Sequence, residues 1–213
     1  MTRRTATCPN CGAPIEFLWS SAVQTTCAFC KSILVRHDVD LQKVGEVGDL
    51  PPSASPIQVA TQGVYRGRPF TVVGRIVYGY ERGGWNEWHL RMDDGASAWL
   101  SDAQAEYAVT HQLESPGTLP GASHLHVGQS YAFDKRLFKV MSLTHAQYRG
   151  VEGELPFEYW NKGEFLFGDL ESTGEQFATL DYSDGDEAPT LYIGEYREFD
   201  DLQFSNLREI EGW

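Results

Sequence analysis

The stretches Cys8-Pro-Asn-Cys11 and Cys27-Ala-Phe-Cys30 decide how the N-terminal part of this chain folds. These two Cys-x-x-Cys pairs contain all four cysteines of the 213 residues, and fifteen residues separate them. Each pair can supply two thiolates from one tight turn, and four thiolates complete the tetrahedral shell of a structural zinc ion. We therefore predict one structural Zn²⁺ ion per chain, bound by Cys8, Cys11, Cys27 and Cys30.

The predicted zinc ribbon occupies residues 1–37. Ile15–Trp19 and Ser32–Arg36 are short apolar runs that we expect to pair as strands behind the metal. So short a unit cannot bury a sufficient core, and zinc supplies on the order of 10–16 kcal/mol in comparable peptides. Two disulfides in a secreted protein are the alternative. The N-terminus has no apolar signal segment, however, and reduced metal-binding thiolates favour a cytoplasmic location.

The charge of the chain is unevenly distributed. The formal net charge is −13, and residues 150–213 carry three Lys/Arg against seventeen Asp/Glu. This acidic third repels nucleic acid and anionic membranes, and it suits either a protein partner with a basic surface or solubility alone. Zinc ribbons often contact nucleic acid, but the basic residues here are too few for a phosphate-binding face. No apolar run approaches the roughly 20 residues of a membrane span. The oligomeric state stays open.

Beyond the ribbon, residues 38–62 lack strong periodicity and are rich in glycine, proline and serine, which is typical of a linker or an extended wrap. The remainder predicts an all-β body. Phe70–Tyr80 and Trp85–Met92 are rich in β-branched and aromatic residues, and Asp93-Asp-Gly95 is a strong hairpin signal between two such runs.

The body contains an internal repeat at an offset of 68 residues. We predict a first β repeat at residues 63–127 and a second, with an acidic C-terminal segment, at residues 128–213. Each repeat is a bent meander, so the expected fold is two tandem small β-barrel-like or half-barrel repeats packed together. The offset aligns Phe70–Val73 with Phe138–Met141, Tyr80 with Tyr148, and Trp99-Leu100 with Phe167-Gly168.

Five stretches of the body form a recognisable combination: Phe70–Tyr78, Trp85–Trp88, Trp99-Leu100, Val151–Pro156 and Leu191–Gly194. Through them the body resembles the bacterial family called domain of unknown function 4178, over about residues 57–205. The resemblance implies tandem small β units and accessory work in envelope or stress physiology, and it supplies no activity and no catalytic residue.

Carboxylates and large aromatic rings are the candidate site residues of the body. The carboxylates could hold a divalent ion or act as acid and base, although capping of turns is the simpler role. The rings could stack on bases or enclose an organic cation, although packing in the core is the simpler role. The candidates are Trp85, Glu87, Trp88, Glu152, Glu154 and Asp169.

Three functions are compatible with these observations. The leading prediction is a non-catalytic, zinc-containing interaction or adaptor protein. The first alternative is a sensor of a small ligand or polyamine-like cation, and a carboxylate-based metal-dependent hydrolase comes last. No catalytic residue is assigned. Convergence of Glu87, Glu154 and Asp169 in one concave pocket would favour binding or catalysis over the adaptor.

Overall fold

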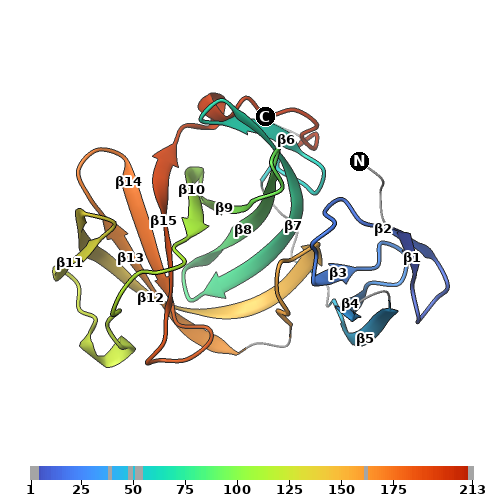
Figure 1. The fold of residues 1–213 in the computed structure, drawn as a ribbon, viewed down its shortest axis with the longest axis horizontal. Coiled ribbons are helices and arrows are strands. Elements are labelled where there is room, and N and C mark those ends of the chain that lie inside the picture. Colours follow the sequence, from blue (N-terminus) through green and yellow to red (C-terminus); the bar gives the residue numbers. More distant parts are fainter. Residues whose placement is uncertain (1–4, 38–39, 48–49, 51–54, 161–162, 211–213) are drawn as a thin grey trace.

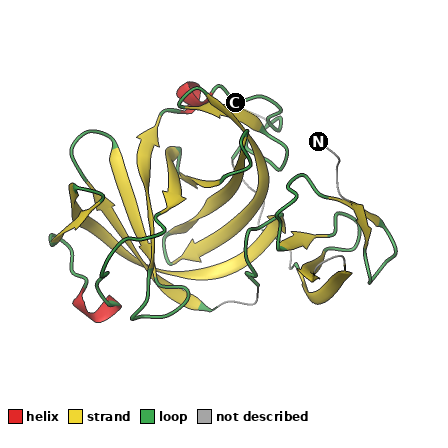
Figure 2. Cartoon of the chain, viewed as in Figure 1, coloured by secondary structure: helices red, strands yellow, loops and turns green. Residues whose placement is uncertain are grey.

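Strands make up nearly all of the regular structure. The computed structural model describes residues 5–37, 40–47, 50, 55–160 and 163–210. Within these ranges two short 3₁₀ helices, η1 (Ala122–His124) and η2 (Phe199–Leu202), accompany the strands, so the all-β prediction is confirmed (Figure 1, Figure 2). The strands are β1 (Thr5–Thr7), β2 (Pro14–Glu16), β3 (Gln24–Thr26), β4 (Ser32–His37), β5 (Asp40–Glu46), β6 (Gln62–Tyr65), β7 (Arg68–Tyr80), β8 (Gly83–Met92), β9 (Ser97–Ala103), β10 (Glu106–Gln112), β11 (Ser130–Phe133), β12 (Arg136–Gly153), β13 (Glu164–Glu171), β14 (Gln176–Asp181) and β15 (Thr190–Arg197).

The N-terminal part, which we call the cysteine module (β1–β5), contains two small sheets beside the main body (Figure 1). The strands predicted at Ile15–Trp19 and Ser32–Arg36 do not pair with each other: β2 pairs with β1, and β4 lies between β3 and β5. The reason is local, because each cysteine pair lies in the turn of its own hairpin, between β1 and β2 or between β3 and β4.

The domain boundaries stay predictions, but one strand bears on the first of them. Residues 40–46, assigned to the linker from sequence, form β5 on the edge of β4. The rest of the predicted linker falls partly on residues 38–39, 48–49 and 51–54, which lie outside the described residues.

The main body is a ring of hydrogen-bonded antiparallel strands. Among the described strands, the order is β7-β8-β9-β10-β15-β14-β13-β12, and β12 pairs again with β7 to complete the ring (Figure 1). Strands β6 and β11 extend the sheet outside the ring, on β7 and β12 respectively. Strands β6–β10 form one consecutive meander and strands β11–β15 form another, so the predicted body of two tandem β units packed together is confirmed.

The two units meet at two seams, β7–β12 and β10–β15. In the first seam Gly79 lies opposite Gln147, a difference of 68 positions. In the second, Thr110 lies opposite Gly194, a difference of 84 positions, and 84 positions also separate the starts of β10 and β15. A residue that faces its own counterpart across an antiparallel pair is the signature of a two-fold, self-complementary contact. The two units therefore pack like the subunits of a symmetric dimer.

The offset of 68 does not continue past the first seam. It aligns Trp99 of β9 with Phe167 of β13, whereas the topological counterpart of β9 is β14. The cause is the connection between β12 and β13, which is longer than the two-residue turn between β7 and β8.

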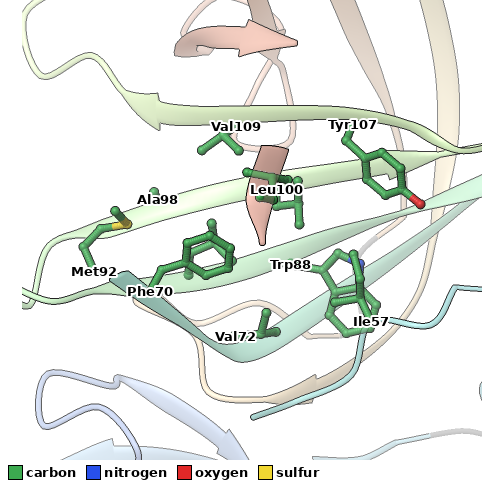
Figure 3. Packing of buried hydrophobic residues seen from close by; sticks show 11 residues of the cluster. Ile57, Phe70, Val72, Trp88, Met92, Ala98, Leu100, Tyr107 and Val109 are labelled. Atoms are coloured by element: carbon green, nitrogen blue, oxygen red, sulfur yellow. The ribbon is translucent and has the colours of Figure 1, made fainter. Parts of the chain in front are cut away.

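Apolar side chains cover the outer face of each unit. In the first unit Trp88, Leu90 and Leu100 are fully buried under Ile57 and the C-terminal segment 199–207 (Figure 3). The second unit has an equivalent cluster, covered by the segment between β10 and β11. Burying each such side chain contributes about 1.5–3 kcal/mol. Because strand residues alternate between faces, the sequence neighbours of these side chains point into the ring.

Within the described residues, no helix is long and apolar enough to cross a membrane.

Candidate metal centre and ring cavity

The four cysteines converge at one point of the cysteine module. Their ligand atoms all lie within 4.8 Å of one another. The Sγ atoms of Cys8 and Cys30 are 3.7 Å apart, and those of Cys11 and Cys27 are 3.8 Å apart. A tetrahedron with metal–sulfur bonds of about 2.3 Å has edges of about 3.8 Å. The four thiolates can therefore hold one metal ion.

The backbone turns that carry the cysteines are alike. In the first turn the N–H of Gly12 donates to the Cys8 carbonyl at 2.9 Å, and in the second the N–H of Lys31 donates to the Cys27 carbonyl at 3.0 Å. Gly12 has φ +76° and Lys31 has φ +58°. This left-handed conformation is easy for glycine and costly for lysine. The lysine conformation is held by the hairpin on either side of it.

One thiol is already biased toward the ligand form. The Ser32 hydroxyl lies 3.2 Å from Cys30 Sγ, and its hydrogen bond lowers the pKa of Cys30 to about 5. A thiolate, not a thiol, binds a metal ion. The donor set of four sulfurs favours a soft or borderline ion.

The second candidate site is the interior of the ring. Two cavities, of about 170 Å³ and 220 Å³, are lined from strands of both units. They share Glu87, Ser101, Phe167 and Thr179, so together they run through the ring interior. Among the described residues that line either cavity, five are acidic besides Glu87 and none is Lys, Arg or His. The five are Glu106, Glu158, Asp169, Asp181 and Asp184.

Glu87 of β8 is the acid common to both cavities. Its carboxylate accepts hydrogen bonds of 2.9 Å from Ser101 Oγ, on the paired position of β9, and from Trp85 Nε1. Burial raises the pKa of Glu87 to about 8, against the lowering effect of these two donors. The nearby Asp169 and Asp181 carboxylates raise it further. Glu87 is half-buried and faces the cavities, and at neutral pH its carboxyl group carries a proton most of the time.

Asp169 of β13 is the corresponding acid of the second unit. It accepts hydrogen bonds from Thr179 Oγ1, its cross-strand partner on β14, at 2.8 Å, and from Ser142 Oγ at 2.9 Å. Burial raises the pKa of Asp169, and these hydroxyls partly offset the rise. Each unit thus places an acid on its second ring strand opposite a hydroxyl on its third. Neither acid has a cationic partner among the described residues.

Aromatic rings form the apolar walls of the cavities. Tyr78 stacks on Trp85 with ring centroids 4.9 Å apart, and the edge of Phe167 meets both rings. Trp99 and Tyr192 line the smaller cavity. The interior therefore combines π faces with the carboxyl groups of Glu87 and Asp169, neither of which has a cationic partner among the described residues, a pairing suited to a cation.

Comparison with known proteins places this body in a family. Residues 58–199 match the family described as Domain of unknown function (DUF4178). The chain belongs to the DUF4178 family. The match begins after the cysteine module and contains the whole ring. No curated protein and no solved structure matches the chain.

The six predicted site residues of this DUF4178 protein fall in four places. Trp85, Glu87 and Asp169 line the ring cavities. Trp88 lies in the outer core, and Glu152 is half exposed and pairs with Arg75 at 3.0 Å.

Glu154 lies at the junction of the DUF4178 ring with the cysteine module. Its carboxylate accepts hydrogen bonds from the backbone N–H groups of Leu18 at 2.6 Å and Trp19 at 2.7 Å. Burial raises the pKa of Glu154 to about 7, partly offset by these two donors. Glu87 and Asp169 therefore share the interior, whereas Glu154 does not.

Several lining residues of the DUF4178 cavity carry no sequence motif. Asp181 lies two positions after Thr179 on one face of β14, and Tyr159 lies outside the regular strands. The alternation in β14 could have placed Asp181 beside Thr179. Nothing local could have placed Tyr159, because its position depends on contacts with the distant cysteine module.

Proposed function

We propose that this DUF4178 protein is a non-catalytic binding protein whose ring interior takes a small, polyamine-like organic cation. The observation that carries the proposal is the composition of the cavity walls: six acidic residues and no basic one among the described lining residues. Buried carboxyl groups are normally paired or neutral. Burial raises the pKa of Glu87 to about 8, so its carboxyl group is mostly protonated at neutral pH, and it has no cationic partner among the described residues.

An ammonium group would replace the proton of Glu87. Glu87 and Asp169 come from different units and face one continuous interior, so a ligand with two or more amines could meet both. The hydroxyls of Ser101 and Thr179 already hold the two carboxylates in place. The geometry is therefore prepared before the ligand enters, which lowers the cost of binding.

The aromatic walls would contribute the rest of the affinity. Cation–π contacts are worth about 0.5–1 kcal/mol at exposed sites and about 2 kcal/mol or more where water is excluded. Trp85 and Trp99 lie at the two cavities, and the stem of a polyamine would bury its methylene groups against them.

Thermal unfolding with spermidine at low salt tests the proposal. Ligand that binds only the native state raises the melting temperature by mass action. We expect a rise for the wild type, a reduced rise for Glu87→Gln, and an undiminished rise for Asp93→Asn, which removes the same charge from an exposed hairpin. A neutral diol of similar length should have no effect. No shift at millimolar spermidine would refute the cation proposal.

We further propose that the metal of the cysteine module is a single structural zinc ion. Four thiolates in a closed shell, with no open position for substrate, are typical of structural zinc. Elemental analysis should find about one zinc per chain, and the Cys8→Ser/Cys27→Ser variant should lose it. Full retention of metal by that variant would contradict the assignment. Reduced thiolates also support a cytoplasmic location for the protein.

One observation supports the adaptor function. Phe29, between Cys27 and Cys30 at the tip of the second turn, is 70% exposed. An exposed ring on a metal-stabilised turn is a suitable contact for a protein partner, whose surface would be basic to match the acidic chain, in envelope or stress physiology. Phe29→Ser should then weaken capture of the partner and leave the metal content unchanged. For the hydrolase alternative, no described cluster besides the four cysteines brings three metal-ligating groups together.

A further inference from the structure

One wall of the smaller cavity comes from outside the ring strands. The segment Glu154–Trp160 follows β12, and Phe157, Glu158 and Tyr159 from it line the cavity. The hydroxyl of Tyr159 lies 2.6 Å from that of Tyr78 on β7, which also lines the cavity. The position of this wall segment, residues 154–160, therefore sets the shape of the cavity.

The cysteine module holds the wall segment through buried hydrogen bonds. Gln24 is fully buried, and its side-chain amide donates to the Tyr159 carbonyl at 3.0 Å and accepts from the Tyr159 N–H at 2.8 Å. The backbones of Gln24 and Leu155 exchange hydrogen bonds of 2.9 and 3.2 Å as an isolated antiparallel bridge. At the start of the segment, the Glu154 carboxylate is bound by the N–H groups of Leu18 and Trp19.

A second contact runs through side chains from the module to the cavity. His89 of β8 is fully buried between Trp19 of the module and Trp99 of the cavity wall, with ring centroids 4.9 and 5.0 Å apart. Its Nδ1 lies 2.9 Å from the Glu154 carbonyl. Trp99 in turn stacks on Phe157 of the wall segment. Displacement of Trp19 would therefore shift His89 and, through it, the Trp99 ring that lines the cavity.

The module residues that hydrogen-bond to the wall segment depend on the metal for their own positions. Leu18, Trp19 and Gln24 all lie between the two cysteine pairs, and Gln24 is three positions before Cys27. A module of this size without metal does not hold its fold. If Gln24 moved away, the buried backbone of Tyr159 would lose its two hydrogen bonds to the Gln24 side chain, which is costly, so we expect the wall segment to rearrange.

We infer that metal binding in the cysteine module and cation binding in the ring cavity are coupled, with the wall segment as the shared element. This inference rests on the proposed function of the cavity. Coupling between sites is reciprocal: the metal raises affinity for the cation, and the cation raises affinity for the metal by the same factor. Coupling energies of this kind correspond to roughly 5–150-fold in affinity.

The test uses the full-length chain in three forms: metal-loaded, chelator-stripped and dialysed, and reloaded with zinc. Spermidine affinity is measured by calorimetry, and amide hydrogen exchange is followed in residues 154–160. We expect the stripped chain to bind spermidine at least 5-fold more weakly, with faster exchange in the wall segment, and the reloaded chain to recover both.

A variant separates the hydrogen bonds between Gln24 and Tyr159 from metal binding itself. Gln24→Leu keeps all four cysteines, so we expect it to retain one metal ion while its wall segment exchanges faster and its spermidine affinity falls. The matched control is Gln42→Leu on the exposed edge of β5, which should change neither. Retention of one metal ion by the Gln24→Leu protein shows that its cysteine module is folded.

The outcomes are distinguishable. Equal spermidine affinity with and without metal, or unchanged exchange in residues 154–160, would overturn the coupling and leave the proposed function standing. No spermidine binding by the metal-loaded wild type would overturn the proposed function, and the coupling with it.

Discussion

The cysteine module and the ring interior both concentrate negative groups, and they manage the charge in opposite ways. The module brings four thiol sulfurs within 4.8 Å, a geometry in which a metal ion neutralises them. The ring brings Glu87 and Asp169 into one cavity system, where the hydrogen-bonding partners of both are neutral. The module thus has the geometry of a metal site, whereas the ring encloses a cavity in which we propose that an organic cation replaces the proton of Glu87.

The largest effect should come from removing the metal from the module. In the Cys8→Ser/Cys27→Ser variant we expect loss of bound metal and loss of exchange protection in residues 5–37 and 40–46, since structural zinc contributes on the order of 10–16 kcal/mol in comparable peptides. The ring strands should stay protected. His37→Ala is the control, because this exposed histidine ends β4 of the module and is not one of the four cysteine ligands. Unfolding of the ring together with the module would break the distinction between the two regions.

The next effect concerns Glu87, the half-buried acid that both ring cavities share. The pKa of Glu87 is about 8 in the folded chain and near 4.5 when unfolded. Between these pH values unfolding releases a proton, so the stability of the wild type falls as the pH rises through this window and is constant above it. Glu87→Gln has no such proton.

Urea unfolding at pH 5 and pH 8 measures the difference for Glu87→Gln. Relative to the wild type, the variant should gain roughly 2–4 kcal/mol between the two pH values, less than the full shift implies because the carboxyl group faces a cavity. A difference between variant and wild type that does not change with pH would show that Glu87 is ionised in the folded chain.

A smaller effect is expected at a ring seam, where no metal is involved. A Cβ on Gly194 would lie 1.9 Å from the Val109 carbonyl oxygen across the β10–β15 seam. Gly194→Ala should lower the free energy of unfolding of the ring by about 1–3 kcal/mol with full metal content. Gly163→Ala, which meets no atom within 4 Å, is the matched control. Loss of metal in Gly194→Ala would show that metal binding by the module depends on an intact β10–β15 seam.

The smallest effect belongs to the surface, which serves neither region. Arg68, the first residue of β7, pairs at 2.5 Å with Asp94 in the turn between β8 and β9, and both side chains are about half exposed. Arg68→Ala should change the free energy of unfolding by less than about 1 kcal/mol, because exposed ion pairs are weak. A change of several kcal/mol in urea unfolding would mean that the hairpin contributes to one of the two regions.

Sequence reasoning reached the cysteine module more fully than the ring. The spacing of Cys8, Cys11, Cys27 and Cys30 is a local signal, and the structure brings all four together. The all-β body and its two packed units were also predictable from alternation and turn residues. Strand partners in the module were not, because apolar runs do not say which neighbour they pair with.

The ring cavity was predictable only in part. Glu87 and Trp85 belong to one recognisable stretch, and Asp169 was assigned to the other unit. Trp88 was grouped with them by proximity in sequence, although alternation turns it to the outer core. Tyr159 is positioned by Gln24, 135 residues away, and no local pattern encodes such a contact.

The most direct test of the central claim is calorimetry of spermidine binding to the metal-loaded chain at pH 7, in two buffers of different ionisation enthalpy. If an ammonium group displaces the proton of Glu87, binding releases about one proton and the affinity rises from pH 6 to pH 8.5. Binding to the Glu87→Gln variant then releases no proton. Binding that releases no proton and is unaffected by Glu87→Gln, or no binding at millimolar concentration, would contradict it.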